Sequence, residues 1–448
     1  MENLVNFKNK SIIFLSGLTD IEKSGNQSFK NTLQGYLNEN WKVKVFTLLP
    51  NDFENLADIN ILKGMKSKNY KRLPTVLTKT FRFFASFKNS FGLENESKNS
   101  QDHLNIPDAN QRYNIWGRAI YFFLPFISLL IELPRITISI LKDRPSIIYG
   151  VNSQGAFSAS IIGRIFRIKI ITRFHGTNVH PLHLKKFITK LKVAHEYIPM
   201  KMYADLQIMT DDGTRGDLVL SLIKNKVKKQ LFLMNGIDDN YYKELKKTLK
   251  ISQEFETAQT KEFNFLTLSR LDKWKRIDIA IKAFHKFIIK YKTQKERIKL
   301  LIVGSGPCED ELKDLAEKLE IKEFIHFYGS IDNKKVAKII SKSNCLLSFY
   351  EHSNRGNPLY EAMVAGLNII TVDDGSVEDL IEHEISGYLC SKNNLIDDCF
   401  YYMERIYSDP LIAIKMKKEI QKKVSNKLIS WTERMQKELS EVEKLLKI

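Results

Sequence analysis

Tyr350-Glu-His-Ser-Asn-Arg-Gly-Asn-Pro-Leu-Tyr-Glu-Ala-Met-Val-Ala-Gly366 is the most informative segment of this 448-residue chain. It follows the apolar run 345–349, which is typical of a buried strand. Asn357 is a favourable N-cap, Pro358 suits the first helical position, and Gly366 is a common helix stop. The segment therefore predicts a strand, a glycine-containing loop and a short helix.

The start of this helix is a candidate anion site. The free N–H groups and the dipole of a helix N-terminus attract negative charge, and a pyrophosphate is the natural anion there. Glu361 lies one turn into the helix, near enough to accept hydrogen bonds from ribose hydroxyls. The alternative is a capped surface helix with a solvated Glu361, which explains the cap but not the neighbouring motifs.

The same alternation of strand and helix patterns extends over both halves of the chain. Short β-rich runs, apolar or alternating, predict strands in the first half at 11–17, 42–47, 145–150, 169–174, 204–210 and 230–234, and in the second at 263–269, 298–303, 325–328, 345–349 and 367–372. Helical patterns such as 278–290 and 307–319 separate them. We therefore expect an α/β protein with two doubly wound, Rossmann-like domains facing across a cleft.

Composition suggests where the domains begin and end. We expect the first domain at 1–238, with an insertion at about 53–116 where the alternation is weakest. The polar stretch 239–262 is the expected connection, and the second domain follows at 263–428. A C-terminal helix at 429–448 is expected to pack back on the first domain.

A basic segment raises the question of membrane contact, since the chain has a net charge of +18. The stretch 61–90 holds eight basic residues, no acid and four interleaved phenylalanines, as a basic membrane-surface segment would. The apolar run 119–131 is interrupted by Pro125 and ended by Glu132, well short of the roughly 20 residues that span a membrane. A core helix and a solvated lysine face are the alternative reading.

The cysteines and paired acids predict no disulfide and no metal site. The cysteines, Cys308, Cys345, Cys390 and Cys399, lie far apart without metal-ligand spacing. The acid pairs Asp211-Asp212 and Asp373-Asp374 lack the Asp-x-Asp pattern and suit turns or caps. The first ten residues also lack a secretory signal pattern. We expect a cytoplasmic protein without metal or cofactor, placed on the inner face of the membrane if the basic segment binds lipid.

Two cations could take the place of a metal. Arg270 and Lys275 follow the first strand of the second domain and could both reach phosphates, Arg270 as a bidentate donor and Lys275 as a point charge. Gly304 ends the next strand, where the backbone could approach a ligand closely.

At this point the chain resembles glycosyltransferase family 4 along most of its length. The matching marks are Arg270-Leu-Asp-x-x-Lys275, the strand 300–304 with Ser-Gly-Pro, His326-Phe-Tyr-Gly329, Glu361-Ala-Met-x-Ala-Gly366, Val377-Glu-Asp-Leu-Ile381, Ser386-Gly-Tyr-Leu389, and, in the first half, Ser24-Gly25-Asn26, Phe174-His-Gly176 and Asn235-Gly-Ile-Asp238.

The resemblance implies a GT-B fold and a retaining, metal-independent hexosyltransferase that uses a nucleotide-sugar donor. The first domain would bind the acceptor and the second the donor. The implied acceptor is a glycan or a lipid-linked molecule, as in cell-surface polysaccharide or lipopolysaccharide synthesis.

It also implies roles for individual residues. Arg270 and Lys275 would hold the diphosphate, Glu361 the ribose, and the backbone around Tyr328 and Gly329 the base. His175 would lie near the transferred sugar, and Gly25 would let the N-terminal loop close over it. The further donor-binding candidates are Gly304, Asn354, Asn357, Pro358 and Leu359.

The chain departs from the family pattern in two places. Where the family often has the first acid of a Glu-x7-Glu motif, this chain has Ser353, and Glu351 lies two residues earlier. The segment resembles a variant with Ser-Asn-x-Gly-Asn before the helix. Ser269 and Arg276 replace the glycines usual beside the two cations.

The sequence has three alternative functional interpretations. A nicotinamide-dependent oxidoreductase is disfavoured because Glu309 stands where the dinucleotide fingerprint has its third glycine. A nucleic-acid-binding protein is disfavoured because the lysines are scattered and no zinc-finger or RNP pattern is present. A nucleotide-sugar epimerase on the same scaffold stays open.

Overall fold

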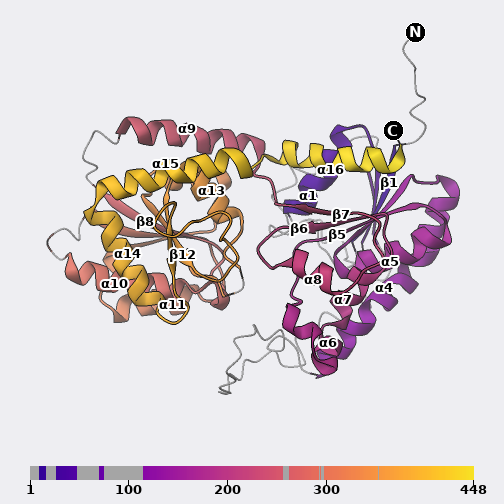
Figure 1. The fold of residues 1–448 in the computed structure, drawn as a ribbon, viewed down its shortest axis with the longest axis horizontal. Helices are drawn as coiled ribbons and strands as arrows, with labels where there is room; N and C mark the ends of the chain where they lie inside the picture. Colours follow the sequence, from indigo (N-terminus) through magenta and orange to yellow (C-terminus); the bar gives the residue numbers. More distant parts are fainter. Residues whose placement is uncertain are drawn as a thin grey trace, which may run out of the picture. The chain divides into compact units, whose positions relative to one another are not determined.

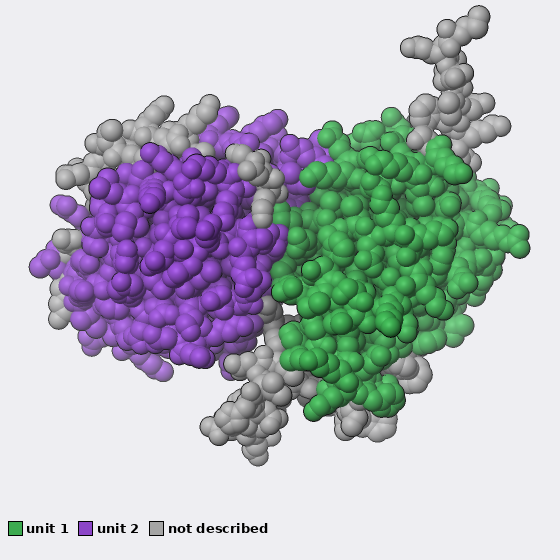
Figure 2. Space-filling view, viewed as in Figure 1, with its two compact units in different colours: residues 1–234, 434–448 green, residues 235–433 purple. Residues whose placement is uncertain are grey.

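Two compact α/β units make up the chain (Figure 2). The computed structural model describes residues 10–16, 27–47, 70–74, 115–255, 262–291, 293, 297–351 and 353–447. Unit 1 comprises residues 1–234 together with 434–448, and unit 2 comprises 235–433. The basic segment 61–90 lies outside the described residues except for 70–74.

The described part of unit 1 contains a seven-stranded parallel sheet with the order β3-β2-β1-β4-β5-β6-β7. Its strands are β1 (Ser11–Leu15), β2 (Lys42–Thr47), β3 (Tyr70–Pro74), β4 (Ile147–Val151), β5 (Lys169–Phe174), β6 (Leu206–Thr210) and β7 (Gln230–Leu233). The six strands expected here are confirmed. β3 was not predicted, because a short edge strand with two cations and a proline has no apolar alternation.

Helices cover this sheet, as the buried strands require (Figure 1). They are α1 (Gln27–Asn38), α4 (Ile115–Lys142), α5 (Asn152–Ile165), α6 (Phe187–Lys192), α7 (Ala194–Lys201) and α8 (Gly216–Leu222), with the 3-10 turn η3 (Pro181–Leu184). Helix α4 continues through Pro125 to Lys142 and contains the whole apolar run 119–131. A proline removes a single backbone donor, which a 28-residue helix can tolerate. Among the described residues, no helix has the length and apolar character needed to cross a membrane.

Unit 2 contains, in its described residues, a six-stranded sheet with the order β10-β9-β8-β11-β12-β13. Its strands are β8 (Phe263–Leu268), β9 (Ile298–Val303), β10 (Ile325–Gly329), β11 (Cys345–Ser348), β12 (Asn368–Val372) and β13 (Tyr388–Cys390). The five strands expected here are confirmed and pair in parallel. β13 was not predicted, because three residues are too few to show a period.

The helices of unit 2 lie on both sides of its sheet (Figure 1). They are α9 (Asp239–Phe255), α10 (Ile277–Lys290), α11 (Glu309–Lys318), α12 (Asn333–Ile340), α13 (Asn357–Ala365), α14 (Leu395–Ser408) and α15 (Pro410–Lys427), with the 3-10 turns η4 (Lys273–Lys275) and η6 (Lys322–Phe324). α10, α11 and α14 share one apolar core with the strands, whereas α13 packs against α9 and α12 also contacts α9. The stretch 239–262, expected as a connection, thus begins with a helix that belongs to unit 2.

Helix α16 (Trp431–Leu446) begins in unit 2, and its residues from Arg434 onward belong to unit 1. There Glu438 is fully buried and accepts hydrogen bonds from the hydroxyls of Tyr36 (3.1 Å) and Tyr149 (3.0 Å). Arg434 pairs with it at 2.6 Å. Burial alone would raise the pKa of Glu438, but Arg434 and Arg173 hold it below its usual value. Losing one partner would leave an uncompensated buried charge.

The strand order of unit 2 determines where ligands can bind. β8 lies between β9 and β11. The strand order therefore runs from β8 to β10 on one side and from β11 to β13 on the other, and it changes direction at β8. In open parallel sheets such a switch point opens a crevice at the carboxyl ends of the strands. The loops after β8, β9 and β11 are therefore the place to look for a site.

Candidate functional site

Three loops of unit 2 are tied together by backbone hydrogen bonds at this edge of the sheet. Leu271, in the loop after β8, donates to the carbonyl of Ser305 at 3.0 Å and accepts from Cys308 at 3.0 Å. Glu351, after β11, donates to the carbonyl of Trp274 at 3.0 Å. The loops after β8, β9 and β11 thus form one continuous surface.

Gly304 makes the close approach of two of these loops possible. Its φ is +131°, a conformation that side-chain-bearing residues rarely adopt, and a Cβ there would lie 1.8 Å from the carbonyl oxygen of Ser269. A glycine is therefore required at position 304 for the contact between these two loops.

Lys275 lies between two aromatic rings. Its ammonium is 3.8 Å from the ring centre of Trp274 and 3.5 Å from that of Tyr350. The Tyr350 hydroxyl donates to the carbonyl of Leu268 at 3.0 Å, which fixes that ring. Burial, opposed by Asp272 and assisted by the positive charge of Arg270, lowers the pKa of Lys275 to about 8. A small cavity beside it is lined in part by Ser269, Lys275 and Tyr350.

Arg270 differs from Lys275 in its surroundings. Its side chain is 71% exposed and meets Asp272 at 3.4 Å. An ion pair this exposed contributes little to stability, so the guanidinium can leave Asp272 for a stronger anion. The positive charge of Arg270 contributes to the lowered pKa of Lys275, and both residues lie in the segment that follows β8.

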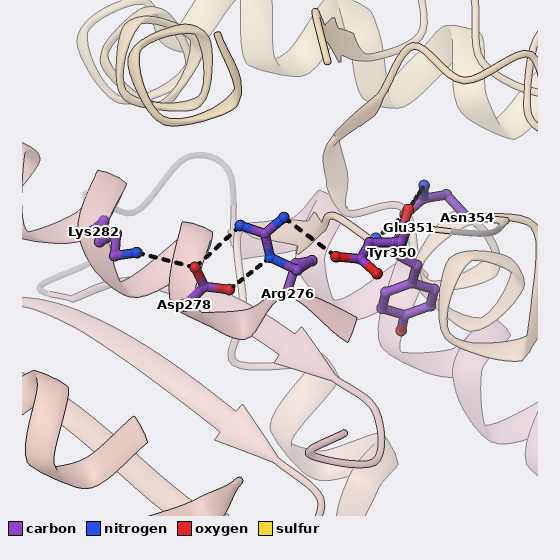
Figure 3. A network of polar contacts seen from close by, with 6 residues as sticks. All are labelled: Arg276, Asp278, Lys282, Tyr350, Glu351 and Asn354. Atoms are coloured by element: carbon purple, nitrogen blue, oxygen red, sulfur yellow. Dashed lines mark hydrogen bonds and ion pairs between the residues drawn. The ribbon is translucent and has the colours of Figure 1, made fainter. Parts of the chain in front are cut away.

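Arg276 joins two of the loops through ion pairs (Figure 3). Its guanidinium contacts Asp278 at 3.0 Å and Glu351 at 3.4 Å, and Asp278 also binds Lys282 at 3.1 Å. Arg276 has a left-handed φ of +51°, a conformation that glycine adopts without strain and other residues rarely adopt. The ion pairs offset that strain. Glu351, the acid closest to Ser353, is thereby directed to Arg276 (Figure 3).

Asn354 is buried and its side chain is fully engaged within the protein. Its Oδ1 accepts from the Ser348 hydroxyl (3.1 Å) and from the N–H of Tyr350 (2.9 Å). Its Nδ2 donates to the carbonyl of Tyr350 (3.0 Å) and to Asp374 (2.9 Å). Two lone pairs and two hydrogens are thus used, which leaves nothing for a donor sugar. In this structure Asn354 shapes the loop.

Helix α13 begins one residue earlier than expected. The N-cap is Gly356 in extended conformation, so Asn357 is the first helical residue and its assignment as N-cap is wrong. No side chain among the described residues caps this helix start. Pro358 is tolerated because it lies in the first turn, and Leu359 is buried, so only its backbone can serve a ligand. Gly366 ends the helix as predicted, with a φ of +71°.

Glu361 has a partner that the sequence did not reveal. The hydroxyl of Tyr241, on α9, donates to its Oε2 at 3.1 Å. Burial raises the pKa of Glu361 to about 7, and the hydrogen bond from Tyr241 opposes the shift. Tyr241 lies in the stretch expected as a connection, where nothing in the sequence marked it as part of a site.

Tyr328 and Gly329 lie at the end of β10, on the far side of β9. The N–H of Gly304 donates to the carbonyl of Gly329 at 2.9 Å, so this carbonyl already has a partner. The ring of Tyr328 contacts His326, with ring centres 4.1 Å apart. These two residues border the loop that contains Gly304.

Two of the candidate site residues, Gly25 and His175, belong to unit 1. Gly25 lies outside the described residues. His175 follows β5, and its Nδ1 is 3.0 Å from Oδ1 of Asn152, the first residue of α5. Burial, together with Arg173 and Arg434, lowers the pKa of His175 well below its usual value. The ring is therefore neutral at pH 7.

No cluster of acids, histidines and cysteines suited to a metal ion occurs in the described parts of either unit. The four cysteines have free thiols, and Cys345, Cys390 and Cys399 are buried.

Part of the chain is similar to known proteins. Residues 250–426 match the family described as glycosyl transferases group 1. The chain is 27% identical over 227 residues to the N-acetyl-alpha-D-glucosaminyl L-malate synthase of Bacillus anthracis, which covers 50% of this chain and 55% of that protein. It is 26% identical over 254 residues to the alpha-monoglucosyldiacylglycerol synthase of Streptococcus pneumoniae, covering 53% and 55%. The chain thus spans about half the length of these two relatives.

The similarity in fold covers more of the chain than the similarity in sequence. The crystal structure of Anabaena Alr3699/HepE in complex with UDP superposes with a TM-score of 0.64 at 14% identity, over 97% of this chain and 100% of that one. At this identity the likeness shows the fold alone, which is the two-domain GT-B fold. The match at 250–426 and the curated relatives support a glycosyltransferase.

Proposed function

We propose that this protein is a retaining glycosyltransferase that moves a hexose from a nucleotide-sugar donor to a glycan or lipid-linked acceptor. The observation that carries the proposal is the placement of Lys275, Arg270 and the uncapped start of α13 on loops at one edge of the unit 2 sheet. A diphosphate carries the charge that two cations and a helix N-terminus would bind.

In the proposed reaction, the bond between the anomeric carbon and the diphosphate oxygen breaks while the acceptor oxygen bonds to that carbon on the same face. The acceptor proton passes to the departing phosphate oxygen, so the products are a glycoside and a free nucleoside diphosphate. Negative charge grows on the leaving group, and Arg270 and Lys275 lower the barrier by stabilising it. Glu361 binds the ribose hydroxyls, and His175 lies near the sugar.

We propose further that the enzyme works without a divalent metal or other cofactor. The two cations supply the positive charge that magnesium supplies elsewhere. The difference in burial between the two residues supports this role. The half-buried Lys275 is already held against the ring of Trp274, and the exposed Arg270 can move onto the donor.

The proposed acceptor is a membrane-bound glycan or lipid on the cytoplasmic face, as in polysaccharide, lipopolysaccharide or glycolipid synthesis. The alpha-monoglucosyldiacylglycerol synthase relative has a glycolipid in its name, and another relative is described as a putative colanic acid biosynthesis glycosyltransferase of Escherichia coli. The net charge of +18 and the basic segment 61–90 suit contact with an anionic surface.

Thermal-shift screening of UDP, GDP, ADP and their sugars tests the proposal, because a ligand that binds the native state raises the melting temperature. We expect one base to stabilise the protein. Proton NMR of the turnover mixture with that donor should then show a product of the same anomeric configuration. An inverted product would contradict retention, and conversion of the donor to its epimer without transfer would identify an epimerase instead.

A further inference from the structure

Asn152 is placed to control the chemistry of His175. It follows the buried strand β4 and begins α5, while His175 follows the neighbouring strand β5. The Oδ1 atom of Asn152 lies 3.0 Å from the ring Nδ1 of His175 and 3.4 Å from the backbone nitrogen of the same residue. One amide oxygen therefore meets both the ring and the main chain of His175.

These two contacts determine which ring nitrogen of His175 carries the proton. The backbone N–H of His175 can only donate, so the Asn152 atom that faces it is the oxygen and not the nitrogen. That oxygen can only accept, so the ring Nδ1 3.0 Å away must carry a hydrogen. In a neutral imidazole the other nitrogen, Nε2, then has a free lone pair.

The surroundings of the ring agree with this assignment. Burial and the positive charges of Arg173 and Arg434 keep His175 neutral, and Arg434 is itself paired with Glu438. Among the described residues, the buried Nε2 atom has no hydrogen-bond partner. It can accept a hydrogen bond that no described residue supplies.

The backbone of Asn152 indicates why an asparagine stands here. Its φ is +55°, in the left-handed region, which asparagine tolerates better than most residues but glycine adopts at no cost. A residue chosen for the backbone alone would be glycine. The amide is the feature that glycine lacks.

We propose that Asn152 is a positioning residue that locks His175 in the Nδ1–H tautomer, so that Nε2 presents a lone pair to a substrate hydroxyl. The tautomer follows from the geometry of unit 1. The substrate part rests on the proposed transferase function, in which His175 lies near the transferred sugar.

Nitrogen-15 NMR of the full-length protein with labelled histidine tests the tautomer without any substrate. The signal of His175 is identified by its loss in His175→Gln. We expect the wild type to show a protonated Nδ1 and a bare Nε2 at pH 7, and Asn152→Gly to shift the population toward Nε2–H. Asn152→Gly is the most informative variant, because it removes the amide and at the same time relieves the strain of the left-handed backbone, so a loss of folding is not expected. Asn152→Asp keeps the acceptor and should keep the Nδ1 proton.

Turnover of the same variants separates the two parts of the proposal. Loss of the hydrogen bond to a sugar hydroxyl should lower kcat about tenfold in Asn152→Gly, with KM for the acceptor little changed. A wild-type His175 protonated at Nε2, or an unchanged tautomer in Asn152→Gly, overturns the inference. A changed tautomer with unaltered turnover leaves the positioning of the ring intact and contradicts its role in transfer.

Discussion

Burial of the Lys275 ammonium costs free energy and also suits this residue for binding an anion. Its ammonium is partly removed from water, which disfavours the charged form, and two aromatic faces compensate in part. A diphosphate would compensate more fully because it brings opposite charge. The residue is therefore poised for an anion in a way that an exposed surface lysine is not.

Nucleoside diphosphate affinity should consequently fall as pH rises above about 8, where the free protein loses the Lys275 charge. The fall should approach about tenfold per pH unit, because each further unit removes the charged form tenfold. Lys275→Arg keeps its charge over this range and should bind with a flat profile. Titration calorimetry at pH 7, 8, 9 and 9.5 measures this, and an equal fall in both proteins would show that another group titrates.

Glu361 offers a test that needs no ligand. The folded pKa of Glu361, about 7, lies above the usual value of 4.5, so between these values the folded protein binds more protons than the unfolded chain. The free energy of unfolding therefore decreases as pH rises from 4.5 to 7. Glu361→Gln should remove on the order of 1–3 kcal/mol of this decrease.

Urea unfolding at pH 5 and pH 7.5 measures that difference. Glu378→Gln is the matched control, since Glu378 is an exposed acid of the same unit and should leave the pH dependence as in the wild type. Equal pH dependence in wild type and Glu361→Gln would mean that Glu361 is not held in a buried setting.

Among the elements, the loops after β8 and β9 depend on Gly304. A methyl group there would meet the carbonyl of Ser269, and backbone cannot yield as a flexible side chain can. Gly304→Ala should lower the free energy of unfolding by about 3 kcal/mol or more and weaken diphosphate binding.

Gly329→Ala is the control for this prediction. Gly329 also has a positive φ, +66°, but a Cβ there would meet nothing within 4 Å, so the cost should be only about 1–2 kcal/mol for the left-handed backbone. Thermal unfolding of both variants decides. Similar losses of stability would show that the loop contact does not constrain the site.

The strands and loops also show which features could be predicted from the sequence. Short apolar or alternating runs predicted eleven strands, because a buried strand is continuously hydrophobic and a half-buried strand alternates. β3 and β13 were not predicted, because β3 is an edge strand and β13 is too short to show a pattern. The cations and glycines of the site follow strand ends and were therefore visible. The Tyr241 partner of Glu361 and the Asn152 partner of His175 were not, because both contacts join segments that only the fold brings together.

Over the whole molecule, the excess of positive charge points to an anionic partner. A soluble diphosphate does not require a charge of this size, so the charge bears on where the enzyme works. The basic segment 61–90 lies largely outside the described residues, and its membrane contact stays a prediction.

Co-sedimentation with vesicles tests that contact. Binding should require anionic lipid and weaken as salt rises, because each basic residue near the surface contributes about 1 kcal/mol that salt screens. Changing Lys66, Lys68, Lys71 and Arg72 to Gln should reduce binding and leave donor hydrolysis in solution nearly unchanged. Equal binding to neutral vesicles, or no effect of the four changes, would leave these residues as a solvated face.

The most direct test of the donor site is calorimetric titration of UDP, GDP and ADP into the protein in the presence of EDTA. One of them should bind without metal, and Arg270→Ala and Lys275→Ala should each weaken it by about 30-fold, since each removes a charge-assisted contact of about 2 kcal/mol. Lys273→Ala, which removes an exposed lysine from the same loop, should bind as the wild type does. Binding that appears only after magnesium is added, or equal affinities of Lys275→Ala and Lys273→Ala, would contradict the account.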